Sequence, residues 1–126
     1  MACNFRDRID SFKPAFAGFW QVWRTQPNAR IHGAISIAII VVGVWLQLSA
    51  ASWALIVLAM GMVWVTEFLN TALEAVVDLA SPRRHKIAKI AKDVSAAAVV
   101  IAALTAMIIG LLVLGRPLWE RVSSLF

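Results

Sequence analysis

Two long stretches of the chain contain no Asp, Glu, Lys or Arg. One covers residues 31–66 and the other covers residues 94–115. A helix needs about 20 apolar residues to cross a bilayer, so the second stretch fits one crossing and the first fits two. A more polar segment at 47–52 separates the two halves of the first stretch. The pattern therefore predicts three transmembrane helices at about 33–47, 53–78 and 94–115.

A different periodicity precedes the first of these spans. Apolar side chains recur there at steps of three and four residues, which is the repeat of a helix with one apolar face. They are Phe5, Ile9, Phe12, Phe16, Phe19 and Trp23. Because proline is tolerated only in the first turn of a helix, Pro14 places the main helix at about 13–25. We expect this amphipathic helix to lie on the membrane surface.

The composition agrees with a membrane protein. The chain has 126 residues, of which 61% are hydrophobic and 15% are charged. Soluble domains average about 45–50% apolar and about 25% charged residues, which argues against a soluble globule. The single cysteine permits no internal disulfide. The predicted fold class is all-α integral membrane, with a surface-helix region over residues 1–30 and a three-span domain over 31–126.

Basic residues give the three spans an orientation. Ten of the twelve Lys and Arg residues lie before the first span or between the second and third spans. Because basic residues near membrane spans are retained on the cytoplasmic side, we expect the N-terminus inside and the C-terminus outside. The net charge of +5 then reflects this orientation and an attraction to anionic lipids. Nucleic acid is not an expected partner.

The second predicted span carries four polar side chains on one face: Glu67, Asn70, Glu74 and Asp78. Successive members are three or four residues apart, so all four project from the same side of a helix. If Trp53 marks the outer boundary, Glu67 lies about 21 Å along the helix, within a hydrocarbon layer about 30 Å thick. A carboxylate at that depth is costly and indicates a functional site. The alternative is a structural one, with Glu67 neutral and hydrogen-bonded and Asp78 solvated at the helix end.

Lys92 and Asp93 stand at the start of the third predicted span. Phosphoryl transfer needs carboxylates that bind Mg²⁺, a lysine that neutralises phosphate oxygens and a further carboxylate that accepts a hydroxyl proton. The polar stripe and Lys92 together therefore predict a phosphate-handling site at the inner membrane surface. Taken alone, Asp93 could equally cap the third helix. The six glycines form none of the common nucleotide-binding motifs, so a nucleotide must be bound by another arrangement.

These residues belong to a longer motif that resembles a known family. The run EFLNTALEAVVD at 67–78 is followed by His85 and by Ala-Lys-Asp at 91–93. Together with NARIH at 28–32, this pattern is similar to that of the prokaryotic diacylglycerol kinases, a family that includes undecaprenol kinases. The resemblance implies a lipid kinase that uses MgATP, with ATP, a membrane lipid alcohol and membrane lipids as partners. It also implies a homotrimer with active sites between subunits, in the prokaryotic cytoplasmic membrane.

The resemblance further implies roles for single residues. Glu67 is expected to be the general base toward the lipid hydroxyl, Asn70 a positioning group and Glu74 a Mg²⁺ ligand. The nucleotide site is expected to consist of Lys92 at the ATP phosphates, supported by Asp78, Asp93, His85 and Arg30. His32 is expected to form hydrogen bonds at the membrane interface, because no Cys or second His stands near it at metal-ligand spacing.

Gln26 departs from the family pattern. The family usually carries a glutamate here as a metal ligand, and this chain has Gln26 followed by Pro27. An amide oxygen binds Mg²⁺ without contributing charge, so we expect weaker metal binding at Gln26. Two alternative functions stay open: a proton- or cation-coupled transporter built around Glu67, and a catalytically weakened or non-catalytic family member. The sequence also leaves the choice between diacylglycerol and undecaprenol open.

Overall fold

The computed structural model contains four helices among the residues that it describes, which are 10, 12–83 and 85–125. In chain order these helices are α2 (Phe12–Thr25), α3 (Pro27–Trp45), α4 (Ala50–Ala80) and α5 (Lys86–Ser123). Phe5 and Ile9, two positions of the predicted surface-helix stripe, lie outside the described residues. The basic residues Arg6, Arg8 and Arg84 lie outside them as well.

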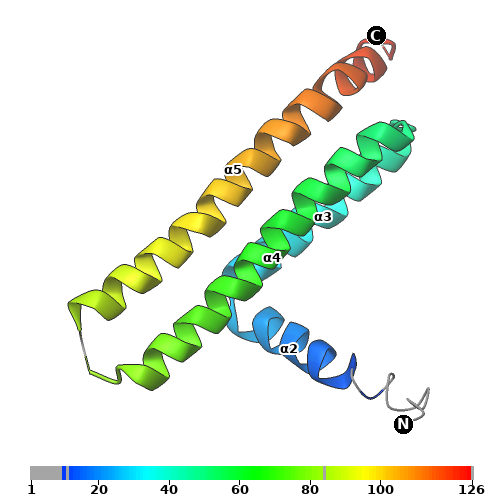
Figure 1. The fold of residues 1–126 in the computed structure, drawn as a ribbon. Coiled ribbons are helices and arrows are strands. Elements are labelled where there is room, and N and C mark those ends of the chain that lie inside the picture. The colour runs from blue at the N-terminus through cyan, green and yellow to red at the C-terminus, as the bar shows by residue number, and fades with distance from the viewer. Residues whose placement is uncertain (1–9, 11, 84, 126) are drawn as a thin grey trace.

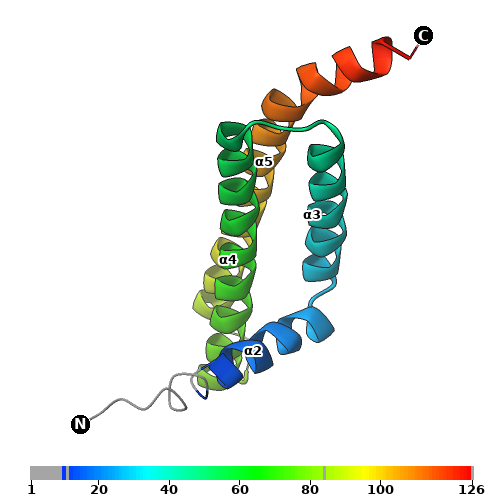
Figure 2. The ribbon, with the colours of Figure 1, turned by 90° about the vertical axis from the view of Figure 1, so that its right-hand side faces the viewer.

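The helices form an elongated bundle in which α4 is the central element. α4 contacts both α3 and α5, while α2 contacts α3 and α4 (Figure 1). The bend between α2 and α3 lies at the same end of the bundle as the connection between α4 and α5 (Figure 2). The turn between α3 and α4 lies at the opposite end, together with the C-terminus. The segments that carry most of the predicted site residues therefore converge on one end of the molecule.

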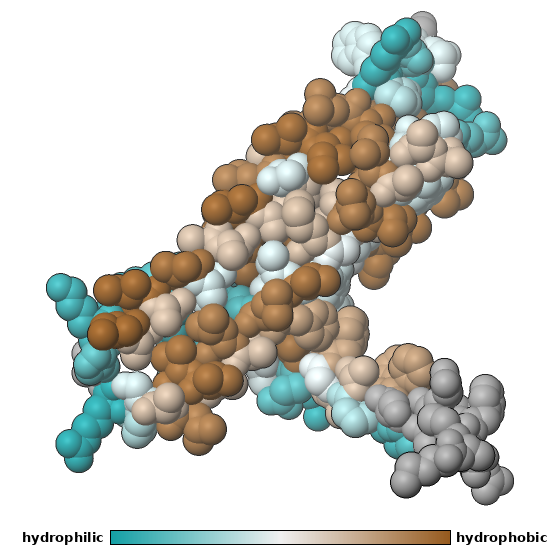
Figure 3. Space-filling view, in the orientation of Figure 1, coloured by the Kyte–Doolittle hydropathy of each residue, from teal (hydrophilic) through white to brown (hydrophobic). Residues whose placement is uncertain are grey.

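Three of these helices are long and apolar enough to cross a membrane: α3 with 19, α4 with 31 and α5 with 38 residues. The predicted number of transmembrane helices is thus confirmed. Apolar side chains cover the middle of the molecule, and hydrophilic ones gather at its ends (Figure 3). α4 and α5 extend beyond both ends of their predicted spans, and α5 continues through Pro117 to Ser123. α3 begins earlier than its predicted span of 33–47, at Pro27, and ends at Trp45, slightly before the predicted end. The last turns of α5 lean away from the bundle, as expected after a proline within a helix (Figure 2).

Few side chains of the bundle are buried within it. The buried apolar residues are small or β-branched and lie where helices cross: Val22, Ala29, Ile56, Ala59, Val63, Val99 and Ala102. Large apolar side chains face outward, as the 77% exposure of Leu112 and the 69% exposure of Leu58 illustrate. Lipid tails are as apolar as these side chains, so such a surface is stable in a bilayer. The chain is therefore a membrane protein whose helices meet through small contact areas.

Stacked aromatic rings attach α2 to the other helices. The ring of Trp64 on α4 lies 5.7 Å from that of Phe19 and 6.4 Å from that of Trp23, measured between centroids. Phe68, one turn further along α4, lies 5.7 Å from Phe19. Trp64 Nε1 donates a hydrogen bond of 3.3 Å to Ser36 Oγ on α3. This aromatic cluster therefore joins α2, α3 and α4 at the level of the polar stripe.

Gly33 on α3 makes room for the aromatic cluster. A β-carbon at this position would lie 2.6 Å from Cζ3 and 2.8 Å from Cη2 of Trp23. Because the Trp23 ring is stacked against Trp64, it has little freedom to move aside. The close approach of α2 to α3 thus depends on the missing side chain of Gly33.

We predict that Gly33→Ala destabilises the protein by about 1–3 kcal/mol, the usual cost of overpacking a tight contact. The matched control is Gly18→Ala on α2, where an added β-carbon meets nothing within 4 Å. This control should be neutral or slightly stabilising, because alanine favours the helix. The measurement is the free energy of unfolding in detergent micelles. Equal stability of the two variants would contradict the proposed close contact.

Candidate functional site

The four residues of the polar stripe lie along α4 with increasing exposure. Glu67 is 1% exposed and Asn70 is 9% exposed, so both are buried within the single chain. Glu74 is half-buried, and the Asp78 side chain is 67% exposed. The stripe therefore has a sequestered half within the bundle and an accessible half near the α4–α5 connection.

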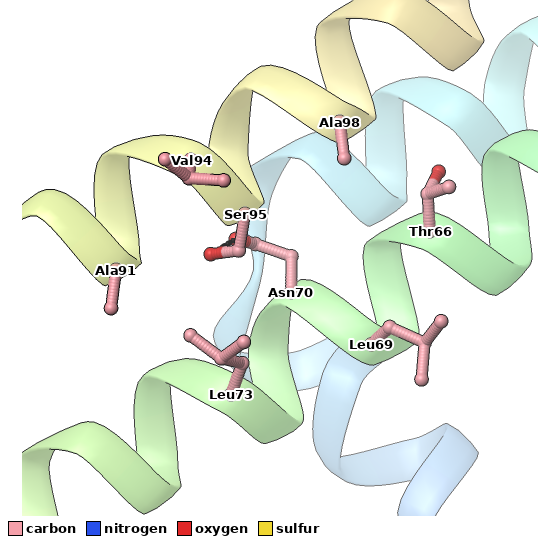
Figure 4. A pocket seen from close by; sticks show the side chains of 8 residues that line it. All are labelled: Thr66, Leu69, Asn70, Leu73, Ala91, Val94, Ser95 and Ala98. Carbon is pink, nitrogen blue, oxygen red and sulfur yellow. Dashed lines mark hydrogen bonds between the residues drawn. The ribbon is translucent and has the colours of Figure 1, made fainter.

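Asn70 connects the two halves of the stripe to α5. Its Nδ2 donates a hydrogen bond of 3.3 Å to Glu74 Oε1. The Ser95 hydroxyl donates a bond of 2.6 Å to Asn70 Oδ1, across the interface between α4 and α5 (Figure 4). The same hydroxyl lies 2.9 Å from the backbone oxygen of Lys92. Asn70 is thus held from both sides, and Ser95 is a site residue that the sequence did not reveal.

A groove of about 500 Å³ opens between α4 and α5 beside Asn70 and Ser95. Its walls are short or apolar side chains, and Asn70 and Ser95 form part of its lining (Figure 4). The other lining residues are Thr66, Leu69 and Leu73 from α4, and Ala91, Val94 and Ala98 from α5. An apolar groove with a few convergent polar groups is the usual form of a small-molecule site.

A second cluster, made of charged residues, lies nearer the α4–α5 connection. Lys92 Nζ on α5 lies 2.6 Å from Asp78 Oδ1 on α4. Lys89 forms an ion pair with Asp93 one turn along α5. A groove of about 600 Å³ borders these groups and is also lined by Arg83, His85 and Lys86. Because ion pairs between accessible side chains contribute little free energy, these lysines can exchange their partners for an anionic ligand.

Glu67, at the buried end of the stripe, has a carboxylate oxygen without a hydrogen-bond partner among the described residues. This atom, Oε2, is buried. The nearest basic group is the imidazole of His32 on α3, whose Nε2 lies 4.0 Å away. A buried carboxylate oxygen without a hydrogen-bond partner is costly, which is typical of a functional group rather than a structural one.

Gln26 and Arg30 lie at the bend between α2 and α3. Gln26 is the residue that precedes α3, and its side chain caps no helix hydrogen bond. Arg30 Nη2 donates a hydrogen bond of 3.2 Å to the backbone oxygen of Arg24, which ties α3 to the end of α2. Among the described residues, neither side chain makes a polar contact with the α4 carboxylates.

His85 lies at the start of α5, and Asp93 lies further along the same helix. The His85 side chain accepts a hydrogen bond of 3.2 Å from the backbone N–H of Ile87, so it caps the start of α5. The interpretation of Asp93 as a helix cap is wrong, because α5 begins at Lys86 and Asp93 lies two turns inside it. The prediction followed the start of the uncharged stretch at residue 94, whereas the helix itself begins earlier, at Lys86.

The metal-binding capacity of the described residues is limited. They contain no group of three or more His, Cys, Asp and Glu side chains that could hold a metal ion. Mg²⁺, however, is commonly bound by one or two carboxylates together with substrate phosphates and water. The half-buried carboxylate of Glu74, with only Oε1 in a hydrogen bond, fits such a ligand.

Comparisons with known proteins give a consistent result. The sequence model of the family described as prokaryotic diacylglycerol kinase matches residues 13–114. The undecaprenol kinase of Bacillus subtilis is 41% identical over 103 residues, which cover 82% of this chain and 84% of that protein. The diacylglycerol kinase of Synechocystis sp. is 44% identical over 109 residues, covering 86% of this chain and 62% of that protein. The diacylglycerol kinase of Escherichia coli is 32% identical over 94 residues, which cover 75% of this chain and 77% of that protein.

We predict that Ser95→Ala destabilises the packing of α4 against α5 by about 1–2 kcal/mol, since Asn70 Oδ1 loses its donor within an apolar surrounding. The matched control is Thr105→Ala on the same helix, whose exposed hydroxyl donates only to Ile101 O of its own helix. The free energy of unfolding of both variants is measured in mixed micelles. If Ser95→Ala lowers this free energy no more than Thr105→Ala does, the interhelical hydrogen bond does not contribute to stability.

Proposed function

The chain belongs to the prokaryotic diacylglycerol kinase family, and we propose that it transfers the γ-phosphate of MgATP to the hydroxyl of a membrane lipid alcohol, either diacylglycerol or undecaprenol. Family membership makes the chain a lipid kinase. The observation that carries the proposal is the buried carboxylate of Glu67 within a membrane helix, on the same face as Asn70 and Glu74. Such a carboxylate is suited to accept a proton from a lipid hydroxyl away from water.

In the proposed reaction Glu67 is the general base. Its carboxylate takes the hydroxyl proton while the lipid oxygen forms a bond to the γ-phosphorus. The bond from that phosphorus to the oxygen bridging to the β-phosphate breaks, and ADP leaves. Phosphoryl transfer of this type depends mainly on positioning and charge neutralisation. The contacts of Asn70 with Ser95 and Glu74 support a positioning role for Asn70.

The nucleotide is proposed to bind at the accessible end of the stripe. Lys92 would leave Asp78 to contact the phosphates, which the accessibility of the pair permits. Asp93 and His85 line the same groove and would support the nucleotide. Arg30 belongs to this proposed set through the family motif alone, since it contacts Arg24 across the α2–α3 bend.

Glu74 is the residue proposed to hold Mg²⁺, with the amide oxygen of Gln26 as a second, neutral ligand. When bound, the metal would neutralise charge on the phosphate oxygens. The half-exposed carboxylate of Glu74 and its place between Asn70 and the charged cluster support this assignment. Because Gln26 adds no charge, binding of the metal is expected to depend on Glu74 and on the phosphates themselves.

We propose a homotrimer in the prokaryotic cytoplasmic membrane, with the N-terminus inside and the C-terminus outside. The large exposed apolar surface of α4 and α5 supports association with lipid and with further subunits. α2 is proposed to lie on the inner surface, with exposed Phe12, Phe16 and Trp20 toward the lipid. One chain already buries Glu67 and Asn70, so enclosure of those residues does not require a second subunit. A neighbour would instead cover the more open part of the stripe around Glu74 and Asp78.

We predict that Glu67→Gln and Glu74→Gln each lower lipid phosphorylation at least about 100-fold, because each removes a charge that the reaction uses. The matched control is Glu120→Gln, the same substitution near the opposite end of α5, where Glu120 pairs with Arg116. The assay follows labelled lipid phosphate in mixed micelles with MgATP, and sedimentation checks the oligomer. Undiminished transfer in the first two variants would disprove their proposed roles.

The same assay identifies the substrate when diacylglycerol and undecaprenol are offered side by side. Phosphorylation of one lipid in preference to the other would establish the kinase activity and identify the branch of the family to which the chain belongs. If neither lipid is phosphorylated, proton-coupled flux in liposomes without ATP would favour the transporter alternative. Absence of Mg²⁺-dependent ATP binding would favour a non-catalytic role.

We predict that Gln26→Glu lowers the Mg²⁺ concentration for half-maximal activity several-fold, because it adds a charged oxygen ligand. Gln47→Glu is the matched control, since Gln47 lies in the turn between α3 and α4 at the far end of the bundle. The measurement is lipid phosphorylation over a Mg²⁺ titration at fixed ATP. An identical Mg²⁺ dependence in both variants and in the parent chain would remove Gln26 from the metal site.

A further inference from the structure

The contact between Glu67 and His32 is not used by the proposed reaction. Glu67 Oε2 is buried without a hydrogen-bond partner among the described residues, and Glu67 as a whole is 1% exposed. Its nearest basic group is His32, whose Nε2 lies 4.0 Å from Oε2 and whose side chain is 17% exposed. The two side chains come from different helices, α3 and α4, so their approach is a product of the tertiary fold.

The surroundings of His32 are almost entirely apolar. It lines an elongated groove of about 620 Å³ between α3, α4 and α5, in which His32 and Ser36 are the polar side chains. Ser36 is already engaged, because it accepts the hydrogen bond from Trp64 Nε1. Electrostatic interactions are stronger where water is excluded, so the imidazole acts on Glu67 with little screening.

We propose that His32 is a positioning residue for Glu67, an inference that rests on the proposed role of Glu67 as general base. The imidazole Nε2–H would donate to Glu67 Oε2 and direct Oε1 toward the lipid hydroxyl. A movement of about 1 Å converts the observed 4.0 Å separation into a hydrogen bond. Hydrogen bonds of catalytic groups are commonly long without substrate and tighten when it binds.

His32 does not exchange a proton with the substrate in this arrangement. The lipid hydroxyl gives its proton to Glu67 Oε1, the lipid oxygen bonds to the γ-phosphorus, and ADP carries away the electron pair of the broken P–O bond. His32 keeps its Nε2 proton throughout. Its effect is on the orientation of Glu67, so it should change kcat more than the binding of either substrate.

The first experiment detects the contact without any reaction. The chain contains only two histidines, His32 and His85, so histidine labelled with ¹⁵N in the ring gives two sets of signals in micelles. His85→Gln assigns them. Glu67→Gln should shift the His32 ring signals and leave those of His85 in place, whereas Glu120→Gln should shift neither. Unchanged His32 signals in Glu67→Gln would overturn the contact, even if the chain proved to phosphorylate no lipid.

The second experiment tests the positioning role with two substitutions of His32. His32→Leu removes the donor and should lower kcat about 10- to 100-fold, the value of a hydrogen bond to a charged group. His32→Gln keeps a donor and should retain kcat within about fivefold. KM for MgATP and for the lipid should change less than about twofold in both variants. Ile31→Ala, at a neighbouring and largely exposed position of α3, is the control and should keep the parent activity.

Equal losses in His32→Leu and His32→Gln, or full activity in both, would overturn the positioning role. So would a loss confined to KM. Unfolding midpoints measured in the same micelles distinguish a loss of fold from a loss of positioning, and His32→Gln keeps the polarity needed for folding. A parent chain that phosphorylates neither lipid refutes the proposed function, while the ring signals of His32 still decide the contact.

Discussion

The structure depends on polar contacts between helices that have little apolar reason to associate. In a bilayer, burial of a leucine against another helix replaces lipid tails of the same polarity, so the hydrophobic effect gives little preference for one packing over another. The bond from Ser95 to Asn70 and the ion pair of Lys92 with Asp78 are specific to one register of α5 on α4. The aromatic cluster around Trp64 likewise fixes the positions of α2 and α3 against α4. The residues that fix the packing of α5 on α4 are therefore also residues of the candidate site.

The graded exposure along α4 separates two kinds of chemistry. Near the α4–α5 connection, accessible lysines and carboxylates pair weakly and can rearrange around an anionic ligand. Deeper in the bundle, Glu67 and Asn70 are buried and have fixed neighbours. One helix thus carries an accessible, charged half near the α4–α5 connection and a buried half within the bundle. That arrangement suits transfer between a water-soluble donor and a lipid acceptor.

The sequence predicted the features that follow from distance along one helix. The uncharged stretches indicated three membrane helices, and the spacing of Glu67, Asn70, Glu74 and Asp78 placed them on one face, because both arguments need only helix geometry. Contacts between helices were not predictable, since Ser95 and His32 gain their meaning only from the neighbours that packing brings to them. The start of α5 was misjudged for a related reason. The prediction followed the change in charge along the chain, while α5 begins earlier, at Lys86, and is capped by His85.

Exclusion of water from Glu67 bears on how a kinase of this kind would avoid hydrolysing ATP. Water is itself an acceptor for a phosphoryl group, so a base that activates hydroxyls must be kept from activating water. Glu67 lies in the buried half of the stripe, and the groove beside His32 is almost wholly apolar. In the proposed reaction a lipid hydroxyl would have to approach the carboxylate along such a surface, which isolated water molecules enter at a cost. The burial that destabilises an ionised Glu67 would then also favour a lipid hydroxyl over water as the phosphoryl acceptor. A hydrogen bond from His32 would offset part of this destabilisation.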